Sequence, residues 1–177
     1  MKRFRYVFLL AGLILIAGFF VSERFVMPVS GAGKQDWNKK SFWHEPWGRS
    51  GVHKGVDIFA HKGTPALAPV DGIVLFAGEI SMGGKVVLML GPKWRLHYLA
   101  HLDAYDVSAG TLLGAGRPVG TVGNTGNAKG KPSHLHYTIL TLVPYPWLAD
   151  SSAQGWKKMF FLDPSLRLVS SLAKTGS

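Results

Sequence analysis

GIVLFAGEISMGGKVVLMLGPKWRLHYLAHL, residues 72–102, decides the fold class of this chain. The stretch contains three short runs rich in Val, Ile and Leu, separated by Gly and Pro residues that mark turns. A fourth run, HLHYTIL, follows at residues 134–140, and no run has the ten-residue apolar stripe of a helix. Short strands at this spacing predict a mainly β fold, either an antiparallel sheet or a compact barrel-like sandwich. A short helical piece is expected around residues 151–159.

The composition excludes several classes of protein. The 177 residues are enough for one domain of ordinary size with a short attachment. Because the chain has no cysteine, any metal must be held by His, Asp or Glu, and disulfides and cysteine nucleophiles are excluded. The net charge of +10 favours polyanions, anionic lipids and carboxylate-bearing substrates. We find no recognition helix or basic and aromatic stripe, so no nucleic-acid partner is expected.

Residues 1–22 are predicted to be a targeting segment. Three basic residues among the first five precede an uncharged run without a polar face, YVFLLAGLILIAGFFVS at 6–22. The run is slightly short of the ~20 residues that span a bilayer comfortably, and only a weak cleavage site follows it, at 29–32. We favour an uncleaved signal anchor, a single transmembrane helix in the inner membrane, over a cleaved signal. Because positive charge stays cytoplasmic, the rest of the chain would lie in the periplasm.

The rest of the chain is predicted to consist of an arm, a β domain and a short tail. Residues 23–45 lack hydrophobic periodicity and are rich in Pro, Gly, Ser and Lys, which predicts a linker or a loosely packed arm. An arm of roughly 20 residues reaches at most about 70 Å when fully extended. The β domain is expected at 46–168, followed by a C-terminal tail at 169–177.

Histidines carry the functional signal. His53 and Asp57 are four residues apart around a glycine, so a tight turn or an extended segment can present both to one side. His134 and His136 are two residues apart in a strand-like run, so their side chains share one face. His101 lies in another strand-like run. Each motif alone has a structural explanation, but together they supply more donors than the three protein ligands of catalytic zinc, which leaves histidines for chemistry.

The sequence resembles the lysostaphin-type, or LytM-type, peptidoglycan metalloendopeptidases over residues 47–140, with a weaker match to 168. The matching stretches are WGRSGVHKGVDIFA (47–60), GTPALAPVDGIVLFAG (63–78), GGKVVLML (83–90), HYLAHL (97–102), GRPVGTVGNTGNAKGKPSHLHY (116–137) and FLDP (161–164). The resemblance implies a compact antiparallel β-sheet or barrel-sandwich hybrid with a groove between loops. It also implies a zinc endopeptidase, with one Zn²⁺ per chain, that hydrolyses peptide cross-links of bacterial peptidoglycan.

The resemblance further assigns roles to five residues. The expected zinc ligands are His53, Asp57 and His136, and the expected catalytic histidines that do not bind the metal are His101 and His134. Which of these two acts as the base is left open. One departure is visible, because Thr138 stands where the family commonly has Glu, two residues after the last ligand. The missing carboxylate predicts a looser orientation of that ligand. The remaining histidines, His44, His61 and His97, are expected to lie outside the site.

The sequence also allows a prediction of the bond that is cleaved and leaves one rival function. We expect cleavage at a D-amino-acid bond of directly cross-linked stem peptides (D,D-endopeptidase activity) rather than of pentaglycine bridges. The short arm would confine the enzyme to wall close to the membrane, and the positive surface would attract the carboxylates of the stems. The rival is a non-catalytic wall-binding regulator of a partner hydrolase on the same fold. The complete set of five site residues favours the enzyme, and no protein partner is indicated.

Overall fold

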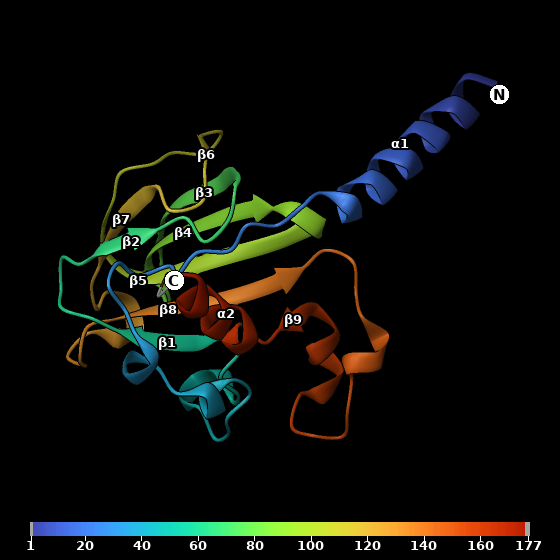
Figure 1. The fold of residues 1–177 in the computed structure, drawn as a ribbon. Helices are drawn as coiled ribbons and strands as arrows, with labels where there is room; N and C mark the ends of the chain where they lie inside the picture. The colour runs from blue at the N-terminus through green and yellow to red at the C-terminus, as the bar shows by residue number, and fades with distance from the viewer. Residues whose placement is uncertain (1, 176–177) are drawn as a thin grey trace.

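The computed structural model describes residues 2–175, in which a sheet-based body follows a projecting N-terminal helix (Figure 1). The described residues form two α-helices, α1 (Lys2–Phe20) and α2 (Ser165–Thr175). The strands are β1 (Val56–Phe59), β2 (Pro65–Leu67), β3 (Gly72–Ile80), β4 (Gly84–Gly91), β5 (Arg95–Tyr105), β6 (Leu112–Leu113), β7 (Pro118–Val122), β8 (His134–Thr141) and β9 (Phe161–Leu162). The four predicted strand runs correspond to β3, β4, β5 and β8. Part of the expected helical piece is a 3₁₀ helix, Gly155–Phe160.

Within residues 2–175, nine strands form one antiparallel sheet, so the predicted mainly β class is confirmed. The main path runs β1-β8-β5-β4-β3-β6, while β7 pairs with β5 and β2, and β9 pairs with β8. The barrel alternative is wrong because the end strands of this path, β1 and β6, pair with β8 and β3 and not with each other. The site described below lies on the central strands β8 and β5 and the neighbouring β1.

One face of the sheet is covered by the segment after α1 and by α2 (Figure 1). The segment 23–45 is therefore not a loosely packed arm, and that prediction is wrong. Val29 and Trp37 are buried in the main core, and both form bridges to strands of the sheet. Backbone hydrogen bonds hold the segment along its length, including one of 2.8 Å from Leu67 N–H to the Pro28 carbonyl. The apolar residues are too widely spaced to form a periodic pattern, but each one fills a position on the sheet.

The C-terminal segment also differs from its prediction. Residues 169–175 continue α2 rather than forming a tail, and residues 176 and 177 lie outside the described part of the chain. Leu168 on this helix is fully buried in the core cluster. The helix thus completes the covering of the sheet and belongs to the domain.

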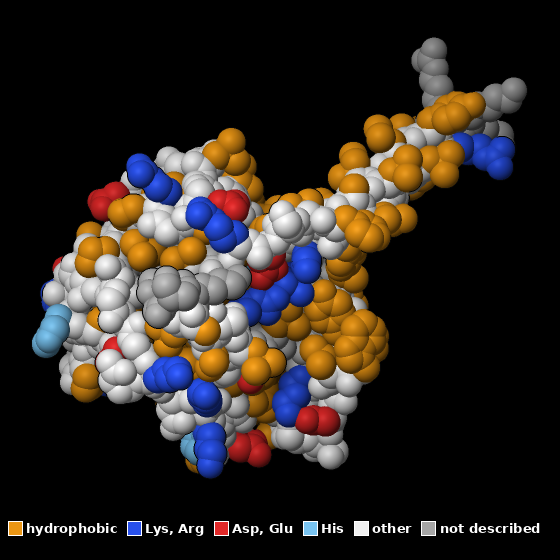
Figure 2. All heavy atoms as spheres, in the orientation of Figure 1, with side chains coloured by type: hydrophobic (Ala, Val, Ile, Leu, Met, Phe, Trp, Pro, Cys, Tyr) orange, Lys and Arg blue, Asp and Glu red, His pale blue; other side chains and the backbone are white. Residues whose placement is uncertain are grey.

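Helix α1 projects from the body and carries exposed apolar side chains along its length (Figures 1 and 2). Its end is fixed to the body, because Trp94 donates a 2.8 Å hydrogen bond from Nε1 to the Leu15 carbonyl. Glu23, just after the helix, binds the side chains of Arg95 on β5 and Arg167 on α2. Among the described residues, no helix meets the combined length and apolarity needed to cross a membrane, so the predicted transmembrane helix is not supported.

Candidate metal centre

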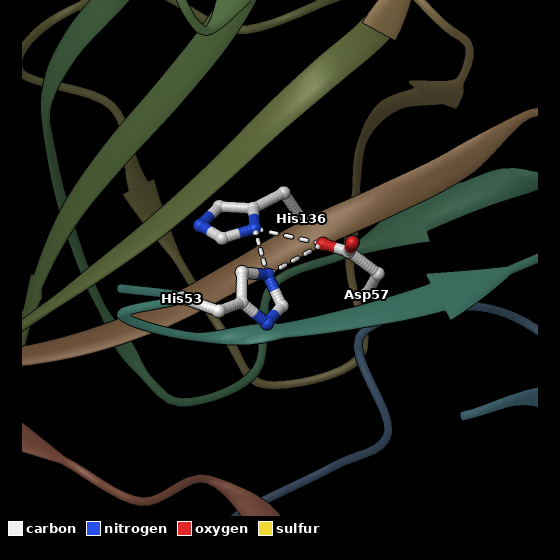
Figure 3. Close-up of side chains that lie close together, drawn as sticks. All are labelled: His53, Asp57 and His136. Atoms are coloured by element: carbon white, nitrogen blue, oxygen red, sulfur yellow. Dashed lines mark hydrogen bonds and ion pairs between the residues drawn. The ribbon is translucent and has the colours of Figure 1, made fainter. Parts of the chain in front are cut away.

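Three side chains at the β1–β8 pair bring their donor atoms together (Figure 3). Asp57 on β1 is the register partner of His136 on β8, and His53 lies just before β1. Asp57 Oδ1 lies 2.8 Å from His136 Nδ1 and 3.1 Å from His53 Nε2, and these two nitrogens are 3.1 Å apart. The structure therefore brings together the three residues predicted as ligands, with their donor atoms close enough to share one ion.

The surrounding hydrogen bonds direct lone pairs into this cluster. His53 Nδ1 lies 2.9 Å from the carbonyl oxygen of Ser41, which can only accept, so the ring carries its proton on Nδ1. Its Nε2 then offers a lone pair to the cluster. Burial alone would raise the pKa of Asp57, but hydrogen bonds to His136 and His53 outweigh burial and lower that pKa. Two imidazole nitrogens and an ionised carboxylate facing one point fit a zinc ion with a position left for water.

His101 reaches the site through a β-bulge in β5. Ala100 lies opposite His136, so a regular strand would point the next residue, His101, to the other face of the sheet. Instead, the register with β4 shifts here, His101 has a φ of +63°, and its N–H donates to the Gly83 carbonyl at 2.8 Å. The ring centroid of His101 consequently lies 5.9 Å from that of His136 and 5.1 Å from that of His134.

His101 and His134, beside the cluster, each keep one ring nitrogen free. Nδ1 of His101 lies 2.9 Å from the Thr125 carbonyl oxygen, and Nδ1 of His134 lies 2.8 Å from that of Pro132. Both rings therefore carry a proton on Nδ1, which leaves Nε2 to accept one. His134 Nε2 lies 3.9 Å from Asp57 Oδ2. Burial, reinforced by the neighbouring histidines, lowers the pKa of His101 to about 4, so this ring is neutral at physiological pH.

Aromatic side chains border the cluster, and the sequence analysis did not identify two of them. Trp47 stacks on His53 with ring centroids 4.1 Å apart, and the Phe59 ring lies 5.4 Å from that of His134. Both are exposed, which makes them candidates for contact with substrate. Phe59 lies two residues after Asp57 on β1, so the two-residue strand period could have placed it on the face of the ligands, whereas no sequence pattern distinguished Trp47. Tyr98 also borders the cluster, since its ring lies edge-on to that of His136, and burial raises its pKa to about 12.

The other three histidines lie outside the cluster. His44 and His61 are exposed. His97 is fully buried on the opposite face of β5 from His101, with Nδ1 2.7 Å from the Tyr137 hydroxyl. Burial, followed by the charges of two nearby arginines, lowers the pKa of His97 to about 3. His97 and His101 lie on opposite faces of β5 although they are four residues apart, because the bulge changes the alternation.

Several known proteins are similar to this chain. The model described as Peptidase family M23 matches residues 51–144. L-Ala--D-Glu endopeptidase of Bacillus subtilis (strain 168) is 32% identical over 132 residues, which cover 65% of this chain and 40% of the relative. Lysostaphin of Staphylococcus simulans is 32% identical over 104 residues, covering 56% and 21%. The chain therefore spans less than half the length of these curated relatives.

Solved structures show the same architecture. The catalytic domain of lysostaphin from Staphylococcus simulans matches with a TM-score of 0.56 and 28% identity, covering 70% of this chain and 85% of that one. A zinc containing peptidase from Vibrio cholerae matches with a TM-score of 0.54 and 25% identity, covering 66% and 37%.

An antiparallel sheet that carries this His–Asp–His cluster defines a zinc metallopeptidase. Because the family model covers more than half of its residues, the chain belongs to Peptidase family M23. The membership confirms the predicted recognition, the class of enzyme, a metalloendopeptidase, and zinc as the cofactor. The roles of individual residues stay predictions.

Proposed function

We propose that the chain hydrolyses peptide cross-links of bacterial peptidoglycan. In this proposal, one zinc ion is bound by His53, Asp57 and His136, and the residues that act on the substrate are His101 and His134. The observation that carries it is the convergence of three donor atoms beside two histidines whose Nε2 atoms are free to accept protons. The names of relatives add support, since they include an L-Ala--D-Glu endopeptidase, a DD-carboxypeptidase/endopeptidase and a glycyl-glycine endopeptidase.

The side chains have distinct tasks in this reaction. A zinc ion held by His53, Asp57 and His136 would lower the pKa of a bound water from 15.7 to roughly 7 and would polarise the scissile carbonyl. One of His101 and His134 would orient the attacking water or accept its proton through Nε2. The other, in its imidazolium form with a proton also on Nε2, would stabilise the oxyanion or give that proton to the leaving amine. Asp57 contributes the negative charge of the ligand set. Trp47, stacked on His53, holds that ring in place from the side of the solvent.

The proposed bond is a D-amino-acid bond in a directly cross-linked stem peptide. The relatives' names cover more than one kind of bond, so the reach of the domain and its charge are what favour this bond. Residues 23–37 pack on the domain, which shortens the distance that the domain could extend from α1. A domain held this close to its attachment acts on wall near the membrane, and the +10 net charge attracts stem carboxylates.

Attachment to the inner membrane through α1, with the domain in the periplasm, is part of the same proposal. Its support is the exposed apolar surface of α1, including Phe8 and Phe20 at 74% and 83% exposure, after a basic start. Cleavage near Gly33 would remove Met27 and Val29 from the core, which favours retention of the helix. Mature protein that begins near Gly33 in membrane-free extracts would overturn this part of the proposal.

Digestion of defined substrates tests the function. The zinc-loaded full chain in detergent is incubated with directly cross-linked dimeric muropeptides and, separately, with a pentaglycine peptide, and the products are identified by mass spectrometry. We expect the muropeptide dimer to be split into monomers. Cleavage of the glycine peptide alone would contradict the proposed bond. Cleavage of neither substrate by a protein that binds zinc would instead support the non-catalytic regulator.

A further inference from the structure

Thr138 contacts the His136 ring on the side that faces away from Asp57. The two residues are separated by one position on β8, so their side chains emerge on the same face of the sheet. Thr138 Oγ1 lies 3.0 Å from His136 Nε2, and the threonine is only 3% exposed. The hydroxyl is therefore shielded from water and directed at the nitrogen of His136 that faces away from Asp57.

The proton of His136 must be located on that outer nitrogen. Nδ1 of His136 faces Asp57 Oδ1 and His53 Nε2, so metal binding requires a lone pair on Nδ1. The neutral ring then carries its proton on Nε2, where Thr138 Oγ1 is the hydrogen-bond partner at 3.0 Å. This is the reverse of the other three histidines of the site, which donate from Nδ1 to backbone carbonyl oxygens of Ser41, Thr125 and Pro132.

We propose that Thr138 is a positioning residue of the metal centre, whose hydroxyl accepts the Nε2 hydrogen of His136 and fixes its tautomer and ring orientation. The proposal rests on the metal centre proposed above. Hydrogen bonds of this kind behind a ligating histidine control metal affinity, and their loss typically lowers it 10–100-fold. A hydroxyl performs this task without adding the negative charge that a carboxylate would bring. Thr138 thus compensates for the missing carboxylate, and ligand orientation is not left loose.

Close packing between β1 and β8 supports the arrangement. Gly55 lies between the two ligands of the first motif, and a Cβ atom at this position would lie 2.5 Å from Thr138 Oγ1 and 2.4 Å from the Tyr137 carbonyl oxygen. Only a glycine allows the chain to pass this close. The turn that carries His53 and Asp57 therefore lies directly against the Thr138 hydroxyl, which limits the positions that this hydroxyl can take.

Zinc affinity of conservative variants tests the proposal. The full chain in detergent is titrated with zinc in competition with a chromophoric chelator. Thr138→Val, which keeps the shape and removes the hydroxyl, should bind zinc 10–100-fold more weakly than wild type. Thr138→Ser, which restores a hydroxyl, should recover most of that affinity. Thr141→Val is the matched control, because Thr141 is a buried threonine on the same strand whose hydroxyl binds the Val143 carbonyl at 2.8 Å, away from the cluster.

Each outcome decides the proposal. Weak zinc binding by Thr138→Val, with recovery in Thr138→Ser and wild-type affinity in Thr141→Val, supports it. Equal zinc affinity of Thr138→Val and wild type overturns the role of Thr138 and leaves the metal centre intact. Weak binding by Thr141→Val as well would show a general effect of removing a buried hydroxyl and would also overturn it. If wild type binds no zinc, the proposed metal centre fails, and the positioning role fails with it.

Discussion

Replacement of Glu23 by Gln should destabilise the domain, because Glu23 fixes the N-terminal segment to two other elements. Its carboxylate binds the guanidinium of Arg95 on β5 and lies 2.7 Å from Arg167 Nε on α2. The Glu23 side chain is 8% exposed, and those of the arginines are 12% and 24% exposed. The Glu23→Gln variant keeps the shape but leaves two mostly buried cations without their counterion.

The expected loss follows from the burial of these groups. Removing one partner of a buried ion pair costs about 3–5 kcal/mol, and contact of both arginines with water places the loss near the lower limit, about 3 kcal/mol. For a protein of this size, each kcal/mol lowers Tm by about 2–4 °C. The Glu23→Gln protein should therefore unfold about 6–12 °C below wild type.

Thermal unfolding of the full chain in detergent, followed by circular dichroism at neutral pH, measures the difference. Lys62→Ala provides the control, since it removes an exposed ion pair with Asp103 of 3.0 Å and should cost less than about 1 kcal/mol. A Tm for Glu23→Gln equal to that of Lys62→Ala would refute the reasoning. The segment after α1 would then contribute little to the stability of the fold.

Further substitutions test the core and the packing beside the site. Burial lowers the pKa of His97 to about 3 from an ordinary value of 6.5. The folded protein therefore has its full stability above pH 6.5, where this histidine is neutral in both the folded and the unfolded state, and loses stability as pH falls towards 3. In the double variant His97→Leu and Tyr137→Phe, the free energy of unfolding should fall by up to roughly 5 kcal/mol less than in wild type over this pH range. An unchanged slope of Tm against pH would contradict this role of His97. Gly55→Ala should lower the free energy of unfolding in urea by about 1–3 kcal/mol and weaken zinc binding, because the added Cβ would clash with β8. Gly114→Ala should be neutral, because its neighbours lie no closer than 3.6 Å. Equal stabilities of the two variants would be inconsistent with the close approach of Gly55 to β8. Leu168→Ala should cost about 2–5 kcal/mol because its side chain is fully buried, and a loss below 1 kcal/mol would show that α2 is not part of the core.

Local patterns were sufficient to predict four of the nine strands in the described part of the chain and to single out the histidine motifs, while the family resemblance supplied the choice of ligands. The runs that became β3, β4, β5 and β8 alternate or concentrate apolar residues over strand lengths, and turns separate them. His134 and His136 share a face because of the two-residue period of a strand, and the β1–β8 register then sets Asp57 opposite His136. Spacing within one element is thus readable from sequence.

Contacts between distant elements could not be predicted in the same way. The orientation of His101 depends on a β-bulge with a positive φ, and periodicity alone would point it away from the site. The segment after α1 buries isolated residues such as Val29 and Trp37, whose partners lie elsewhere in the chain. The absence of a carboxylate at Thr138 predicted a loosely oriented ligand, but sequence could not show that the Thr138 hydroxyl lies 3.0 Å from His136 Nε2.

The most direct test of the account measures zinc content and peptidoglycan hydrolysis on the same preparations of wild type and five alanine variants. We expect one zinc per chain and release of muropeptides by wild type. His53→Ala, Asp57→Ala and His136→Ala should lose both zinc and activity, whereas His101→Ala and His134→Ala should retain zinc and lose turnover. Loss of stoichiometric zinc from the His134→Ala protein would make that residue a ligand, and full activity of the His53→Ala protein without zinc would contradict the metal centre itself.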